Sequence, residues 1–207
     1  MKEEKILRFG VIGAGRIGKI HAENLANRVP GAEVAAIADV NLEMAQEAAA
    51  RLRIPAVYAD YHQILADPSI DAVAICSSTD THAHIVVEAA QAGKHIFCEK
   101  PIDHDLAKID AALEAVKKAG VKLQIGFNRR FDPNFAHVRE LVSQGKVGDL
   151  HLLRITSRDP APPPVSYVKV SGGMFLDMTI HDFDMARFLS GRDRKSTRLN
   201  SSHITIS

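Results

Sequence analysis

LRFGVIGAGRIG, residues 7–18, joins a short apolar segment to a run of closely spaced glycines. Residues 7–12 are mostly apolar, as in a short buried strand, and Gly13 ends them. Apolar side chains then recur at helical spacing over residues 17–29. A strand, a glycine turn and a helix in this order are typical of one unit of a parallel sheet in an α/β protein.

The glycines of this stretch fit the pattern G-x-G-x-x-G. Gly13 allows the tight turn, and Gly15 lets backbone N–H groups approach a pyrophosphate because no Cβ stands in the way. Gly18 lets the helix pack closely on the strand, and the amino terminus of the helix adds free donors and partial positive charge. The predicted dinucleotide contacts in this turn are Gly13, Ala14, Gly15, Arg16 and Ile17.

Asp39 is the second part of the dinucleotide-binding pattern, because it ends the next apolar strand 21 residues after Gly18. A carboxylate there accepts hydrogen bonds from both hydroxyls of an adenosine ribose and repels a 2′-phosphate. The sequence therefore predicts NAD as cofactor in preference to NADP. The alternative role for Asp39 is that of an ordinary turn residue.

Strands and helices continue to alternate beyond this point. Such alternation is typical of a parallel sheet covered by helices on both faces. Residues 1–125 are accordingly predicted to form an NAD-binding Rossmann domain of α/β class. Further strands are expected at 33–38, 57–58, 71–75, 95–98 and 123–126, and further helices at 41–52, 81–92 and 105–119.

Polar residues follow two of these strands where each one ends. The carboxyl ends of parallel strands meet at one edge of a sheet, where ligands of open α/β sheets bind. We therefore expect these residues to contact the cofactor, although ordinary loop residues are the alternative. They are Ser77, Ser78 and His82 after the fourth strand, and Glu99 and Lys100 after the fifth.

The pattern changes after Gly126. A helix is predicted at 133–144, a longer alternating strand at 149–157, and a second helix at about 175–189, after a proline-rich segment. Residues 193–207 show no apolar period, which a flexible tail would explain. Asp193–His203, however, resembles residue for residue the translation of a common sequencing adapter, so we expect 193–207 to be a non-native tail.

Five motifs together resemble the Gfo/Idh/MocA oxidoreductases, over residues 5–192. This resemblance implies that residues 126–192 are the incomplete beginning of an α+β open-sheet substrate domain. It also implies that catalysis is carried by Lys100, Asp177 and His181. The motifs are GAGRIG at 13–18, FCEKPI at 97–102, GFNRRFD at 126–132, SRDPAPPP at 157–164 and GGMFLDMTIHDFDMARF at 172–188.

The three implied catalytic residues suit the oxidation of a secondary alcohol, which loses a hydride to the cofactor and a proton from oxygen. His181 has the chemistry of a general base. Asp177, four residues earlier on the predicted helix, can orient the imidazole or bind a neighbouring hydroxyl. Lys100 can hold the reacting oxygen and stabilise an alkoxide. The alternative for Asp177 and His181 is a surface i,i+4 pair, and no metal is expected because no third ligand has suitable spacing.

Asn128 and Arg129 follow the sixth strand, and the resemblance implies that this segment contributes to a polyol pocket. For Arg130 a salt bridge at the domain junction is an equal alternative. The implied reaction is NAD-dependent oxidation of a cyclitol, with myo-inositol to 2-keto-myo-inositol as the leading case. The alternatives are a related dehydrogenase of another sugar or polyol, and a non-catalytic NAD-binding regulator or fragment.

Composition narrows the possible partners. The 207 residues carry a net charge of +1, so no basic field indicates nucleic acid. No apolar run approaches the ~18 residues of a membrane span, and MKEEK does not resemble a signal peptide. Two cysteines without metal-ligand spacing favour a reduced, cytoplasmic setting. A small-molecule substrate is expected as partner, and the resemblance implies a homo-oligomer, a dimer or tetramer, for the full-length form.

Overall fold

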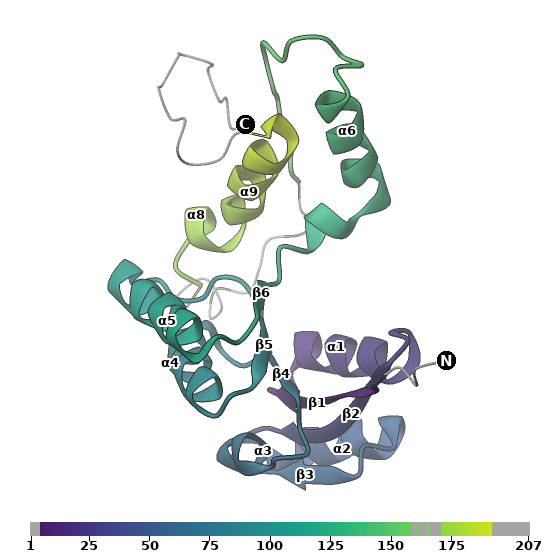
Figure 1. The fold of residues 1–207 in the computed structure, drawn as a ribbon, viewed down its shortest axis with the longest axis vertical. Helices are drawn as coiled ribbons and strands as arrows, with labels where there is room; N and C mark the ends of the chain where they lie inside the picture. The colour runs from purple at the N-terminus through teal and green to yellow at the C-terminus, as the bar shows by residue number, and fades with distance from the viewer. Residues whose placement is uncertain (1–4, 159–160, 162–164, 166–170, 192–207) are drawn as a thin grey trace. The chain divides into compact units, whose positions relative to one another are not determined.

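The computed structural model describes residues 5–158, 161, 165 and 171–191 (Figure 1). The predicted tail at 193–207 and most of the proline-rich segment lie outside the described residues. The chain divides into two compact units, residues 1–126 and residues 127–207, and each is described by itself.

The first unit is built on one parallel sheet of six strands in the order β3-β2-β1-β4-β5-β6. This order is that of the doubly wound dinucleotide-binding fold, in which the chain reverses direction across the sheet between β1 and β4. The predicted α/β Rossmann class is confirmed. The strands are β1 (Leu7–Ile12), β2 (Ala32–Ala38), β3 (Ala56–Tyr58), β4 (Ala72–Ile75), β5 (His95–Cys98) and β6 (Leu123–Ile125).

Five helices accompany these strands, and four of them match predicted ones. The helix expected at 41–52 is capped by Asn41, whose side chain accepts a hydrogen bond from the Met44 amide. The short helix α3 was not predicted, because five residues are too few to show a helical period. The helices are α1 (Arg16–Asn27), α2 (Leu42–Leu52), α3 (His62–Ala66), α4 (Thr79–Gln91) and α5 (Leu106–Ala119).

Two apolar layers pack the sheet, one on each face. Val11 and Ile37 lie in a buried cluster with small residues of α1 and α2. Ile12 and Ile75 lie in the other cluster, with residues of α3, α4 and α5 (Figure 1). Neighbouring residues of one strand point to opposite faces of the sheet. Because helices cover both faces, both residues are apolar.

The second unit is helical in its described residues. Among these described residues the buried apolar side chains are Met185 and Leu189, both on α9. The elements are the 3-10 helix η1 (Asn128–Phe131) and the helices α6 (Pro133–Ser143), α8 (Met174–Asp177) and α9 (Thr179–Ser190).

The predicted strand at 149–157 is wrong for this structure, because residues 150–158 form no regular element. A strand needs a neighbouring strand to take its backbone hydrogen bonds. The described part of the second unit holds no strand that could do so. Alternation of side chains was therefore not enough to produce the strand.

The single helix predicted at 175–189 is also corrected, since it is broken at Met178 into α8 and α9. The hydroxyl of Thr179 donates to the Met174 carbonyl at 2.8 Å. The His181 amide bonds the Met178 carbonyl at 3.1 Å, three residues back, as in a tighter helical turn. Asp177 thus ends α8, and His181 lies in the first turn of α9, so the two residues do not share one unbroken helix.

Candidate active site

The glycine turn lies between β1 and α1, and its backbone is hydrogen-bonded to the end of β2. Gly13 has a φ of +100°, and its amide donates to the Ala38 carbonyl at 2.8 Å. A Cβ built on Gly13 would lie 2.6 Å from the carbonyl carbon of Cys76. Both the positive φ and the close approach of β4 therefore require glycine here.

Gly15 and Gly18 differ in what surrounds them. Gly15 caps α1, and a Cβ built on it would meet nothing within 4 Å. A Cβ on Gly18 would lie 1.8 Å from the Gly13 carbonyl oxygen. Gly18 thus serves helix packing, whereas Gly15 keeps open the space in front of the first helical N–H groups. This open cradle fits the pyrophosphate of a dinucleotide.

Asp39 follows β2 and faces the turn. Its Oδ2 accepts a hydrogen bond from the Ala14 amide at 2.6 Å, and its Oδ1 accepts one from the Asn41 amide at 2.8 Å. Each carboxylate oxygen has two acceptor positions, so both retain capacity for a ribose hydroxyl. The residues present fit NAD at the adenosine end as well as at the pyrophosphate.

The side chains of the residues after β4 form hydrogen bonds mainly within this segment. Ser77 donates to the Thr81 hydroxyl at 2.7 Å, because the proton of Thr81 already goes to the Ser78 carbonyl. His82 is 2% exposed, with Nε2 3.1 Å from the Ser77 carbonyl and Nδ1 2.8 Å from the Pro101 carbonyl. His82 therefore joins the loops after β4 and β5, while Ser78 is the exposed member of the predicted set.

Glu99 and Lys100 come directly after β5 and are partly buried. The Glu99 amide continues the sheet by donating to the Ile75 carbonyl at 3.0 Å. The Glu99 carboxylate lies 2.7 Å from Nε2 of His21, on α1. His21 was missed by the sequence reasoning, since 78 positions separate the two residues and no spacing rule relates them.

Cys76 and Cys98 are buried, unpaired thiols on the same edge of the sheet. Burial, together with the nearby Glu99 charge, raises the pKa of Cys98 to about 12 and raises that of Cys76 as well. A thiol is nucleophilic only as thiolate, so neither residue is suited to be a nucleophile.

We expect both cysteines to resist alkylation in the native protein at pH 8, since almost none of either thiol is ionised or accessible there. Iodoacetamide labelling followed by mass spectrometry measures this. Labelling in denaturant should modify both residues and is the control. Rapid stoichiometric modification of the native protein would contradict the burial described here.

In the second unit, Asp177 and His181 are both partly buried. Asp182 and Asp184, on α9, are fixed by arginines of the preceding 3-10 helix. Arg129 donates to Asp182 at 2.6 Å and to the Ser157 hydroxyl at 3.1 Å. Asn128, the other predicted substrate contact, is exposed.

Arg130 forms a two-pronged ion pair with Asp184, at 2.8 Å and 2.5 Å. Asp184 is 9% exposed, and its carboxylate raises the pKa of the Arg130 guanidinium. The guanidinium also lies over the Phe188 ring, 5.4 Å from its centroid. Within the second unit Arg130 therefore has a structural role, which the sequence left open.

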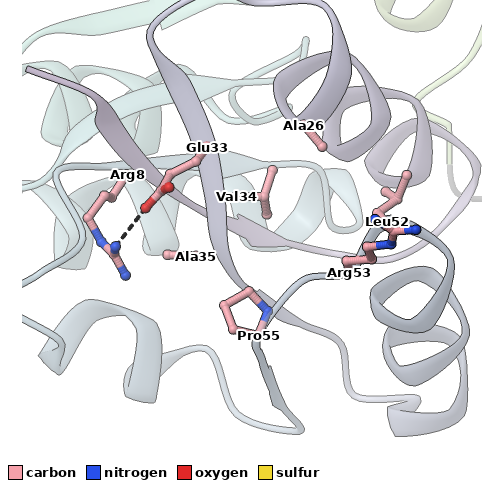
Figure 2. Close-up of a pocket in the computed structure, with 8 residues that line it drawn as sticks. All are labelled: Arg8, Ala26, Glu33, Val34, Ala35, Leu52, Arg53 and Pro55. Atoms are coloured by element: carbon pink, nitrogen blue, oxygen red, sulfur yellow. Dashed lines mark hydrogen bonds and ion pairs between the residues drawn. The ribbon is translucent and has the colours of Figure 1, made fainter. Parts of the chain in front are cut away.

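Other kinds of site find no support in the described residues. No group of three or more histidine, cysteine or acidic side chains could hold a metal ion there. No helix among them is long and apolar enough to cross a membrane. Figure 2 shows a hollow beside Arg8 and Glu33, whose side chains form an ion pair of 2.6 Å. It lies near the starts of β1 and β2, away from the glycine turn at the end of β1.

Sheet order, glycine turn and Asp39 together define a Rossmann unit for dinucleotide binding. A family model described as an oxidoreductase family with an NAD-binding Rossmann fold, Gfo/Idh/MocA, matches residues 7–127. The model of the Gfo/Idh/MocA C-terminal domain matches residues 135–204. The chain belongs to the Gfo/Idh/MocA oxidoreductase family.

Curated and solved relatives agree with this assignment. The chain is 54% identical to a myo-inositol 2-dehydrogenase of Thermotoga maritima, over 90% of the chain and 56% of that protein. It is 49% identical to an inositol 2-dehydrogenase of Rhizobium meliloti, with the same two coverages. A scyllo-inositol dehydrogenase of Lactobacillus casei, solved with NAD(H) and scyllo-inositol, has a TM-score of 0.84 at 38% identity, covering 91% of this chain and 57% of its own. The chain thus spans little more than half the length of these relatives.

Proposed function

We propose that the full-length enzyme oxidises a secondary alcohol of a cyclitol with NAD, converting myo-inositol to 2-keto-myo-inositol. Full-length here means the complete gene product, which on our proposal lacks the non-native tail at residues 193–207. The observation that carries the proposal is the glycine turn with Asp39 at the end of the neighbouring strand. The three residues expected for catalysis, Lys100, Asp177 and His181, are also present in the chain. Relatives named as inositol 2-dehydrogenases support the choice of substrate.

In this reaction NAD supplies the hydride acceptor. His181 takes the proton from the substrate hydroxyl, since an imidazole both accepts and returns a proton near neutral pH. Lys100 places its ammonium group at the reacting oxygen and stabilises the developing alkoxide. Asp177 orients the imidazole or a neighbouring hydroxyl. His82 lies between the loops after β4 and β5, close to the Ser77 and Pro101 carbonyls, and so helps to hold these loops together.

Substrate contacts in the second unit are part of the same proposal. The exposed amide of Asn128 has donors and acceptors suited to a polyol. Arg129 already donates to Asp182 and Ser157. A guanidinium has five N–H donors, so we propose that its remaining N–H groups bind the substrate. We also propose a cytoplasmic enzyme, which the two unpaired cysteines support, and a homo-oligomer for the full-length form.

A second candidate function is oxidation of a different cyclitol isomer, favoured by the likeness to a scyllo-inositol dehydrogenase. Both candidates are tested by assaying the full-length enzyme with NAD against myo-inositol, scyllo-inositol and a panel of sugars, following NADH absorbance. Highest kcat/KM with myo-inositol is expected. A preference for a sugar, or no turnover with any polyol, would overturn the proposal.

Cofactor preference should depend on Asp39. We expect Asp39→Ser combined with Val40→Arg to lower the ratio of the NADP Kd to the NAD Kd, because a repelling charge is replaced by an attracting one at the 2′ position. Val40 is 97% exposed and can accept a long side chain. Both constants are measured on the 207-residue chain by titration.

The matched control for this variant is Asp67→Ser. Asp67 makes a comparable turn, accepting a bond from the Ser69 amide at 2.8 Å, but it lies before β4 at the other end of the sheet. Its replacement should leave the ratio of the two dissociation constants unchanged. If the unaltered protein binds NADP more tightly than NAD, the role given to Asp39 is wrong.

A further inference from the structure

The carboxylate of Glu99 joins the helix after the glycine turn to the main chain at Lys100. Its Oε1 lies 2.7 Å from Nε2 of His21, on the second turn of α1. Its Oε2 accepts the Lys100 amide at 3.3 Å. A carboxylate only accepts hydrogen bonds, so Nε2 of His21 is the donor. The Glu99 side chain therefore connects the main chain of the proposed catalytic lysine to α1, the helix that follows the glycine turn.

Packing around this pair restricts both partners. The His21 ring packs at a tilt on the Phe97 ring, with centroids 4.8 Å apart. A Cβ built on Gly126 would lie 3.0 Å from the Glu99 carboxylate, so the backbone of residue 126 closes the other side. The side chains of His21 and Glu99 are 26% and 19% exposed, which leaves the bond partly shielded from water.

We infer that His21 is a positioning residue for Lys100, acting through Glu99. This inference rests on the proposed function, in which the Lys100 ammonium acts at the reacting oxygen. By fixing the Glu99 carboxylate, His21 also fixes the acceptor of the Lys100 amide and hence the start of the lysine side chain. Errors of about 1 Å in the placement of a catalytic group can cost ~10²-fold in rate.

The test compares His21→Leu with His21→Gln in the full-length enzyme. Leucine removes the donor, whereas the glutamine amide can place an N–H close to the position of Nε2. We expect kcat to fall at least about tenfold in His21→Leu and to recover in His21→Gln, with the NAD dissociation constant unchanged in both. The matched control is His84→Leu, which removes an exposed contact of 3.1 Å between Nε2 and the Glu88 carboxylate and should not alter kcat.

A second measurement does not depend on activity. Hydrogen exchange of the Lys100 amide, followed by NMR on the 207-residue chain, should accelerate in His21→Leu and stay slow in His21→Gln. Unchanged exchange in His21→Leu would overturn the inference whether or not the enzyme oxidises cyclitols. Normal kcat in His21→Leu would overturn it too. If the unaltered enzyme turns over no polyol but the exchange result holds, the proposed function fails and the His21–Glu99 link stands.

Discussion

Replacing Lys100 with methionine is expected to lower kcat of the full-length enzyme by ~10² to 10⁴, as loss of a charge at a developing alkoxide does. Methionine keeps a stem of similar length, so the effect reports the missing ammonium group. NAD binding should change little, because the proposed contacts of the dinucleotide are the glycine turn and Asp39. The measurement is kcat and KM with myo-inositol, beside NAD binding by fluorescence.

Companion variants test whether the three proposed catalytic residues, Lys100, Asp177 and His181, act as one unit. His181→Ala should lower kcat by a similar ~10² to 10⁴, and Asp177→Asn by less if Asp177 only orients the base. Combining the two should cost little more than His181→Ala alone. Lys118→Met, at an exposed lysine in the last turn of α5, is the matched control and should leave kcat unchanged. Near-normal turnover in His181→Ala would remove that residue from the mechanism and leave Lys100 as the candidate base.

Two glycine substitutions in the turn should have opposite consequences for stability and binding. Gly18→Ala should destabilise the first unit by ~1–3 kcal/mol or more, because its Cβ would lie 1.8 Å from a backbone oxygen. Gly15→Ala should leave the melting temperature unaltered, since its Cβ would meet nothing within 4 Å in the protein. That methyl group would instead occupy the cradle for the pyrophosphate, so NAD binding should be lost.

Thermal unfolding and NAD titration of the 207-residue chain separate these two effects. Each glycine variant serves as the control for the other, because both add one methyl group within four residues of chain. Tight NAD binding by Gly15→Ala would show that the dinucleotide does not approach this turn. An unchanged melting temperature in Gly18→Ala would show that α1 is not seated on β1 as closely as described.

The first unit could be predicted from sequence because its signals are local. The apolar run of β1, the glycines after it and the cap residue Asn41 each act within a few positions of themselves. Parallel order then follows from the alternation of strands and helices. The strand expected at 149–157 did not form, because a strand depends on a partner that no local pattern supplies.

Side-chain partners were the part that sequence could not provide. The sequence does not show that the two ring nitrogens of His82 lie close to the Ser77 and Pro101 carbonyl oxygens, 24 positions apart. The bond between His21 and Glu99 likewise depends on how far α1 lies from β5 after folding. At the break near Met178 the Thr179 hydroxyl donates to the Met174 carbonyl, and the apolar spacing of the sequence does not predict that bond.

The bond from the Ala14 amide to Asp39 has a consequence for how this enzyme could evolve. Asp39, the residue proposed to discriminate between cofactors, is also the acceptor of the Ala14 amide in the glycine turn. A lineage that changes its cofactor must therefore lose an acceptor for a buried amide at the same step, which typically costs about 1–3 kcal/mol. The switch would be accessible mainly from ancestors with stability to spare, or after a neighbouring side chain had taken over the Ala14 amide.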